Sequence, residues 1–392
     1  MPLLRASVTA RPRLLGLSLA AIALVAGCAS PQGTPQTTVF PMTEAGRMIQ
    51  DLYVWIFWMS AIVFVAVQGG ILYIVWRFRY RPDHPLPEQV HGNNRLEIMW
   101  TILPAIILVI IAFPTIFTLF SLDRDASAEP VRLQAFGFEL WPRVQLGGVQ
   151  VWPIGREPRP LSPGPPLPIE VIGHQWWWEY RYPEQGGLVS ANELIVPTGR
   201  TIELKMRSDD VVHSFWVPQL MGKQDVMPAH VNTLWFAAEE PGQYFGQCAE
   251  YCGIQHAQMR MNVIAYSPAD FQAWVARNQR PALPTTDLAQ QGEQIFRGYP
   301  CVACHRIDGT SAQGTLAPDL SHFGSRTTIA AGILPNTPEN LARWLRNPDE
   351  VKPGNHMANP PAHFNLGTLS RDYLNLRPSE VEALVEYLHS LK

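Results

Sequence analysis

The chain has 392 residues, which at about 150 residues per domain predicts two to three domains and excludes a single small disulfide-stapled fold. Charged residues make up 16% of it, against roughly 25% in an average soluble protein, and the net charge is −3, so a basic nucleic-acid-binding protein is excluded. Hydrophobic residues reach 47% although the mean hydropathy is −0.03, which predicts a few very apolar segments joined to water-soluble domains.

Residues 1–28 have the features of an export signal, with arginines before an apolar run that is too short to span a bilayer. Small residues precede Cys28, and this end of the segment resembles a bacterial lipobox, which implies lipid attachment at Cys28. An ordinary signal peptide with an incidental cysteine is the alternative. A polar spacer is expected over residues 29–51.

Residues 52–122 are expected to form a transmembrane hairpin. The apolar segments 52–76 and 98–122 each have about the 20 residues that a membrane-spanning helix needs, although buried core helices are the alternative. Four arginines lie between them and predict a cytoplasmic loop, so everything after residue 122 is expected on the outer face.

A connector rich in proline and glycine occupies residues 123–168 and includes a strand-like piece at 149–152. Residues 169–280 then contain short β-rich runs separated by turn residues, which predicts a sandwich or barrel, and they end with a short helix at 270–277. The β-rich runs are 169–172, 193–196, 201–206, 211–217, 233–237 and 261–265.

Residues 281–286 are interpreted as a linker into a third, helical domain over residues 287–392. Thr337 is a candidate N-cap because a proline follows it, and it would begin an amphipathic helix at 339–346. A last helix is expected at about 379–391, where apolar residues recur at helical spacing.

The third domain contains the sequence C-x-x-C-H, the attachment motif for c-type haem. The thiols of Cys301 and Cys304 would bind the porphyrin covalently, and His305 would be the proximal ligand of the iron. A zinc site would need a second cysteine pair, and a thioredoxin-like redox pair would need a βαβ context. The sequence around this motif offers neither.

A second cluster gathers soft metal ligands. Cys248, Cys252, His256 and Met259 lie within twelve residues, and His213 lies 35 residues before the first cysteine. Sulfur and imidazole donors together favour copper or zinc. A Cys248–Cys252 disulfide is the other alternative outside the cytoplasm, but it would leave the remaining members without a role.

The chain resembles subunit II of the haem-copper cytochrome c oxidases, in the form that carries a fused cytochrome c domain. The resemblance rests on the C-x-x-C-H motif, the cluster of soft metal ligands and the transmembrane hairpin that precedes both. The resemblance covers residues 52–392 except 123–168, a stretch longer than the family usually has. It implies a dinuclear copper centre, CuA. In this centre Cys248 and Cys252 bridge two coppers, His213 and His256 bind one each, and Met259 and the backbone carbonyl of Glu250 complete the set.

The second axial ligand of the haem iron is expected to be Met357, because residues 352–355 precede it as they do in the methionine loop of cytochrome c domains. The family often has proline after this methionine, and Ala358 stands there instead. His322, His356 and His363 are the rival ligands.

Other residues take roles from the same resemblance. Trp176 corresponds to the residue that passes electrons towards CuA, although a tryptophan of the β core is the alternative. Glu97 corresponds to an acidic residue at the cytoplasmic mouth of a proton path, although an interfacial carboxylate in water is the alternative. The side chain of Glu250 corresponds to a ligand of a magnesium ion shared with subunit I.

The sequence patterns predict a two-helix transmembrane hairpin, a β domain and a helical domain, and the resemblance implies that these two domains are an all-β cupredoxin-like Greek-key barrel and an all-α class I cytochrome c domain. The resemblance implies a subunit of a bacterial inner-membrane oxidase that takes electrons from an external donor and passes them through haem c and CuA to subunit I. Subunit III and membrane lipid are further expected partners, oxygen reduction and proton pumping are expected in subunit I, and no nucleic acid is expected. The alternative is a membrane-anchored electron carrier or copper-binding protein without an oxidase partner. A quinol oxidase subunit would lack the copper ligands, and nitrous oxide reductase would lack the hairpin.

Overall fold

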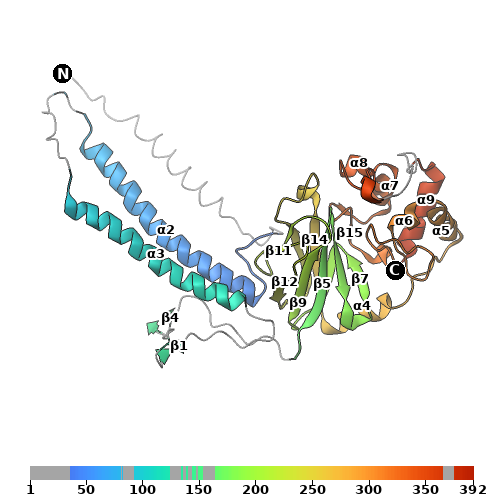
Figure 1. Cartoon of the computed structure of the whole chain (residues 1–392), viewed down its shortest axis with the longest axis horizontal. Coiled ribbons are helices and arrows are strands. Elements are labelled where there is room, and N and C mark those ends of the chain that lie inside the picture. The colour runs from blue at the N-terminus through green and yellow to red at the C-terminus, as the bar shows by residue number, and fades with distance from the viewer. Residues whose placement is uncertain are drawn as a thin grey trace, which may run out of the picture.

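The computed structural model describes residues 36–80, 82, 92–123, 164–364 and 375–392, and four short strands between residues 134 and 152. The predicted export signal and its Cys28 lie outside the described residues. Figure 1 shows a helical hairpin at one end, a β domain in the middle and a small helical domain at the other end. This order in space follows the order in the chain.

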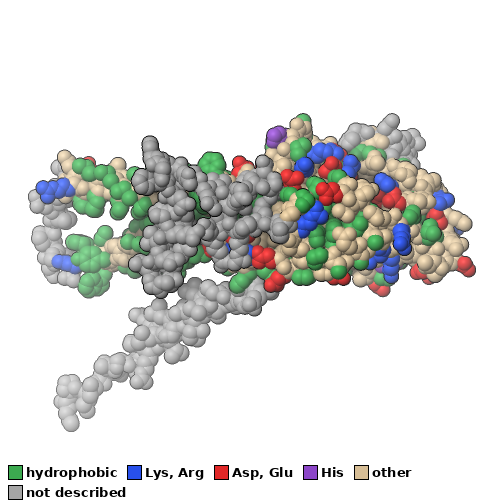
Figure 2. Space-filling model, turned by 90° about the horizontal axis from the view of Figure 1, so that it is seen from below, with side chains coloured by type: hydrophobic (Ala, Val, Ile, Leu, Met, Phe, Trp, Pro, Cys, Tyr) green, Lys and Arg blue, Asp and Glu red, His purple; other side chains and the backbone are tan. Residues whose placement is uncertain are grey.

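The hairpin consists of α2 (Glu44–Arg77) and α3 (Asn94–Leu122), both long and apolar enough to cross a membrane. Helix α2 begins earlier than predicted, so the end of the expected spacer 29–51 is helical. The reason is an N-cap: the Thr43 hydroxyl accepts a hydrogen bond from the backbone N–H of Gly46. Figure 2 shows hydrophobic side chains along the hairpin and basic side chains at its far end, as expected for a lipid-facing surface with a cytoplasmic loop.

Hydrogen bonds join the inner end of the hairpin to the β domain. The backbone N–H of Met42 donates to the carbonyl of Gln219 at 2.8 Å, and the indole N–H of Trp235 donates to the carbonyl of Leu122 at 3.1 Å. Arg47, in the first turns of α2, pairs with Glu239 of the β domain. These contacts fix the β domain next to one end of the hairpin.

The β domain contains two five-stranded sheets with the apolar core between them. The strand orders are β11-β10-β13-β14-β8 and β12-β9-β5-β6-β7, antiparallel except for the parallel pairs β14/β8 and β5/β9. This is the expected cupredoxin-like fold. The strands are β5 (Leu167–His174), β6 (Trp177–Tyr182), β7 (Leu188–Ala191), β8 (Glu193–Pro197), β9 (Ile202–Ser208), β10 (His213–Trp216), β11 (Gln224–Val226), β12 (Asn232–Phe236), β13 (Gly242–Cys248) and β14 (Arg260–Tyr266).

Each of the six β-rich runs contains a strand, but the sequence did not predict β6, β7, β11 or β13 as strands. In β6 most residues are aromatic or charged and nearly all are buried, so the alternation of polar and apolar residues is absent. The predicted piece at 149–152 is β4 (Val149–Trp152), which pairs with β3 (Val144–Leu146). A second small hairpin joins β1 (Gln134–Ala135) and β2 (Phe138–Glu139).

The third domain is helical, as predicted, with its core between α5 and α9. Gly292 of α5 permits their close approach, because an added Cβ would lie 2.0 Å from the carbonyl oxygen of Ala383. A two-stranded hairpin of β15 (Thr328–Ile329) and β16 (Leu334–Pro335) interrupts the expected all-helical pattern. The helices are α5 (Asp287–Gly298), α6 (Cys301–Cys304), α7 (Pro338–Arg346), α8 (Pro348–Val351) and α9 (Pro378–Ser390), after α4 (Pro268–Asn278) at the end of the β domain. Single 3₁₀ turns are η2 (Pro183–Gln185), η3 (His256–Gln258), η4 (Phe323–Ser325) and η5 (Ala362–Phe364).

Two candidate metal centres

Neighbouring strands and one loop bring the predicted copper ligands together. His213 begins β10 and Cys248 ends β13, and these two strands pair with each other. The chain then turns back through the loop at residues 249–255 into η3, which begins with His256 and is followed by Met259. The backbone N–H of Cys248 donates to the carbonyl of Met259 at 2.9 Å, which closes this loop.

The ligand atoms form a compact, nearly symmetric set. The sulfur atoms of Cys248 and Cys252 are 3.8 Å apart. His213 Nδ1 lies 3.9 Å from Cys248 Sγ, and His256 Nδ1 lies 3.7 Å from Cys252 Sγ. The sulfur of Met259 is 3.8 Å from Cys252 Sγ, and the Glu250 carbonyl oxygen is 3.3 Å from Cys248 Sγ.

These distances distinguish between the three alternatives that the sequence left open, which are a disulfide, a zinc site and a copper site. Both thiols are free, and their separation of 3.8 Å is far longer than the roughly 2.05 Å of a disulfide bond. Each sulfur has its own imidazole nitrogen beside it, so the donors surround two positions, whereas a structural zinc site surrounds one with four ligands. The residues present therefore fit a pair of copper ions bridged by two thiolates.

Electrostatics favour one thiolate before any metal binds. The hydrogen bond from Cys252 lowers the pKa of the Cys248 thiol well below its usual range, although burial acts in the opposite direction. The pKa of Cys252 is raised, because this thiol donates that hydrogen bond and is removed from water. Metal binding would require both sulfurs to be deprotonated.

Surrounding residues orient the ligands. His213 Nε2 lies 2.9 Å from Asp210 Oδ1, which leaves Nδ1 free to bind a metal. The side-chain N–H groups of Gln175 and Trp176 both donate to the carbonyl of Cys252 at 2.9 Å. Neither Asp210 nor Gln175 was predicted from the sequence, although Asp210 lies only three residues before His213, a spacing that places it within reach of the imidazole.

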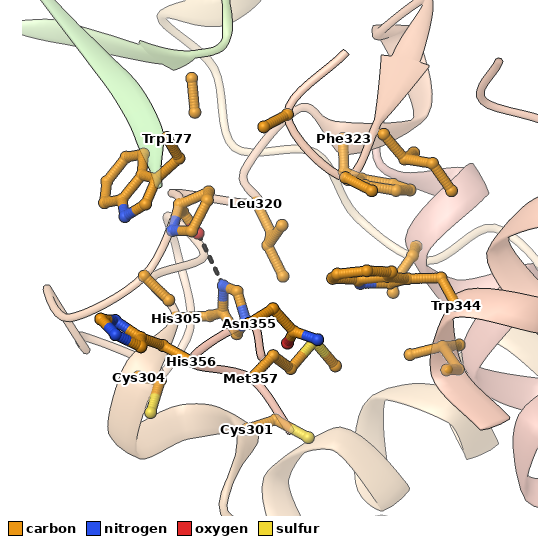
Figure 3. Close-up of a pocket in the computed structure, with 18 of the residues that line it drawn as sticks. Trp177, Cys301, Cys304, His305, Leu320, Phe323, Trp344, Asn355, His356 and Met357 are labelled. Atoms are coloured by element: carbon orange, nitrogen blue, oxygen red, sulfur yellow. Dashed lines mark hydrogen bonds between the residues drawn. The ribbon is translucent and has the colours of Figure 1, made fainter. Parts of the chain in front are cut away.

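The second candidate centre is a cavity in the helical domain. Cys301, Cys304, His305 and Met357 line it, together with apolar side chains such as Phe323 and Trp344, and Figure 3 shows these six residues. His305 Nδ1 donates to the Pro318 carbonyl at 2.7 Å. Removal from water lowers the pKa of His305 to about 4, so the ring is neutral near pH 7 and its Nε2 is free to bind iron. The residues present fit a covalently attached haem.

The positions of the rival axial ligands differ. His322 is not among the residues that line the cavity, and the side chain of His363 lies outside the described residues. His356 lines the cavity, but its ring lies against Trp176 and Phe364, with centroids 4.6 Å and 5.6 Å away. Met357 lines the cavity and packs against the core of the domain, so it stays the proposed ligand.

Within the part of the chain that the structure describes, the side chains of Glu250 and Glu97 belong to no group of three side chains placed to hold a metal. The Glu250 side chain is exposed, and its Oε1 accepts a hydrogen bond from the backbone of Tyr251 at 3.2 Å. Within the described residues, the only group of three His, Cys, Asp or Glu side chains placed to hold a metal is His213, Cys248 and Cys252. Glu97 lies in the first turn of α3 and accepts a hydrogen bond from the backbone of Asn93, so it helps to cap this helix.

Comparison with known proteins identifies the family. Three family models match: the transmembrane domain of cytochrome c oxidase subunit II over residues 37–118, its periplasmic domain over residues 185–266, and cytochrome c over residues 289–392. The chain is 35% identical to cytochrome c oxidase subunit 2 of Alkalihalophilus pseudofirmus, with 97% of each chain covered. It is 31% identical to that of Bacillus subtilis, with 94% of each covered.

Among solved structures, the periplasmic domain of subunit II of cytochrome oxidase from Bradyrhizobium japonicum is 31% identical, with a TM-score of 0.29. The match covers 30% of this chain and 96% of that one. The full-length likeness to the curated relatives, together with the two metal centres, leads to one conclusion: the chain belongs to the cytochrome c oxidase subunit II family, with a CuA-type domain and a fused cytochrome c domain.

Proposed function

We propose that this chain is the subunit through which electrons enter a bacterial cytochrome c oxidase complex. Its residues would hold a haem c that accepts electrons from an external donor and a CuA centre that supplies them to the haem-copper centre of subunit I. The observation that carries this proposal is the pair of metal centres in adjacent domains of one chain, each with its ligand set assembled. Both centres supply one-electron redox chemistry when loaded, which suits a relay rather than a catalyst.

The chain's own residues hold and insulate the two groups. Cys301 and Cys304 would attach the haem covalently, with His305 and Met357 on the iron. The six CuA residues named above would hold the two coppers. Cys248, Cys252 and Met259 lie in the apolar core of the β domain, and Cys301 and Met357 pack against the core of the helical domain, which would limit the access of water to the metals.

The proposal includes the place of the chain in the membrane. The hairpin would cross the bacterial inner membrane twice and leave both redox domains on the periplasmic side, with Cys28 as a lipid anchor. Glu97, at the end of α3 far from the β domain in Figure 1, would lie at the cytoplasmic mouth of a proton path that serves proton pumping in subunit I. Glu250 would need ligands from subunit I to bind magnesium, because within the described residues it belongs to no group of three His, Cys, Asp or Glu side chains placed to hold a metal.

The test uses the complex purified from its own membranes through a tag on this chain. We expect a large haem-containing membrane subunit to copurify and the complex to consume oxygen with reduced cytochrome c as donor. Cys252→Ser should abolish oxygen consumption and leave the covalent haem in place, whereas Ser267→Ala, at the cap of α4, should change neither. Purification without any haem-containing partner would support the free electron carrier and overturn the oxidase assignment.

A further inference from the structure

The helical domain rests on the β domain through a buried carboxylate. Glu193, at the start of β8, is only 3% exposed. Its Oε1 accepts hydrogen bonds from both the backbone N–H and the hydroxyl of Thr327 and of Thr328, at 2.6 to 2.9 Å. A buried carboxylate with four donors is strongly held, and removing it would leave these donors without their partner.

Apolar and backbone contacts extend this interface. Trp177 and Ala191 of the β domain form a buried cluster with Ala331 of the helical domain. The backbone N–H of Arg260 donates to the carbonyl of Ala331 at 3.1 Å. Gly332 lies so close that an added Cβ would be 3.1 Å from Arg260 Cβ. The two domains therefore fit together in one defined orientation.

The loop that carries Met357 contacts Trp176 and the loop at residues 249–255, which is called the copper loop because it joins the copper ligands Cys248 and His256. Lys352 is only 4% exposed, and its ammonium group donates to the carbonyl oxygen of Trp176 at 3.4 Å. Gln255, beside the copper ligand His256, donates to the carbonyl of Pro353. The walls of the haem cavity thus include residues from both domains, among them Trp176 and Trp177.

A continuous series of contacts runs between the two centres. The His356 ring, next in sequence to Met357, lies 4.6 Å from the Trp176 ring, centroid to centroid. The indole N–H of Trp176 donates to the carbonyl of the copper ligand Cys252 at 2.9 Å. Trp176 is only 9% exposed, and the His356 ring of the helical domain lies against it. An external protein could not lie against this indole while the domains stay together.

We propose that Glu193 is the residue that holds the helical domain on the β domain, and that His356 is the positioning residue that places the loop carrying Met357 on Trp176. This inference rests on the proposed function. One electron would move, from an iron that goes from ferrous to ferric to a copper pair that is reduced by one electron, and no bond forms or breaks.

The test compares variants in the complete, haem- and copper-loaded complex. Electron transfer from haem to copper is followed by haem absorbance after a light pulse reduces the haem through a ruthenium photosensitiser in solution. We expect His356→Ala to slow this step roughly tenfold or more, since small displacements of a positioned group have effects of this size. His356→Phe, which keeps a ring against Trp176, should stay near the parent rate. The exposed His230→Ala serves as control.

The role of Glu193 at the domain interface can be tested by a measurement that does not depend on electron transfer. Hydrogen exchange at the amides of Thr327 and Thr328 should accelerate in Glu193→Ala, and less in Glu193→Gln, which keeps an acceptor oxygen. The exposed Glu382→Ala in α9 should leave both amides unchanged. Haem absorption and the copper paramagnetic signal should match the parent in every variant.

The role of His356 would be overturned by an unchanged transfer rate in His356→Ala, or by an equal loss of rate in His356→Phe. The role of Glu193 would be overturned by unchanged hydrogen exchange at Thr327 and Thr328 in Glu193→Ala. A shifted haem spectrum in the His356 variants would also contradict the inference, because His356 would then act on the iron. Failure of the proposed function is distinct, since the parent complex itself would then lack the signal of a copper pair.

Discussion

Gly253 allows the copper loop to lie against Trp176. Its φ is +116°, a region that side chains disfavour, and an added Cβ would lie 3.0 Å from Trp176 Cζ2. Gly187 also has a positive φ, of +74°, but nothing lies within 4 Å of its Cβ position. An alanine at position 187 would therefore meet backbone strain alone, whereas an alanine at position 253 would meet both backbone strain and close packing.

Gly253→Ala should destabilise the copper-free chain by roughly 2 to 4 kcal/mol, because it adds backbone strain and displaces the indole. Gly187→Ala should cost only about 1 kcal/mol, for backbone strain alone. Calorimetry of the full chain in detergent would measure both. Equal losses in the two variants would mean that Trp176 does not pack against this glycine.

Lys352 is the buried cation of the domain interface. Removal from water lowers its pKa from 10.5 to about 7. Between pH 7 and 10.5 the unfolded chain therefore holds a proton that the folded chain has lost. The free energy of unfolding consequently rises with pH across this window, and the full cost of the buried charge is present below pH 7.

Lys352→Met should therefore raise the free energy of unfolding on the order of 1 to 3 kcal/mol at pH 6, with a gain that shrinks as the pH rises towards 10.5. Unfolding of the full chain at pH 6, 8 and 10 would test this. The exposed Lys205→Met is the matched control and should change stability by less than about 0.5 kcal/mol at each pH. A gain from Lys352→Met that is constant with pH would show that the ammonium is not desolvated.

At the scale of elements, short sequence motifs predicted the features whose residues lie close together in the chain. The C-x-x-C-H motif and the cluster from Cys248 to Met259 are each contained in a few residues, and the structure brings their members together. Helix α7 begins at the predicted cap, where the Thr337 hydroxyl accepts from the N–H of Asn340 at 3.3 Å. Strand β13, which positions Cys248, was missed because glycine, glutamine and aromatic residues replace the apolar alternation.

Thr337→Ala should cost about 1 kcal/mol of stability in the helical domain, because the first turn of α7 loses its cap. Thr337→Ser keeps a hydroxyl and should retain most of that energy. Thermal unfolding followed by haem absorbance would report on this domain. Equal losses in the alanine and serine variants would assign the effect to packing of the methyl group instead of capping.

For the molecule as a whole, the sequence predicted three domains in the right order but not how they contact each other. Glu193 and Thr327 are 134 residues apart, and Trp176 and His356 are 180 apart, so no local pattern connects them. The interface depends on buried polar groups whose partners only the folded chain brings together. Contacts of this kind hold the two domains together and are the basis of the proposed path between their metal centres.

The central claim is that one chain holds a covalent haem and a copper pair. The most direct test is electron paramagnetic resonance, with copper and iron counts, on the full chain loaded with both metals. We predict two coppers per haem iron and a copper signal shared over two nuclei, which Cys252→Ser abolishes while the covalent haem stays. A chain that carries haem but no copper, with Cys248 and Cys252 in a disulfide bond, would contradict the account and leave a membrane-tethered cytochrome c.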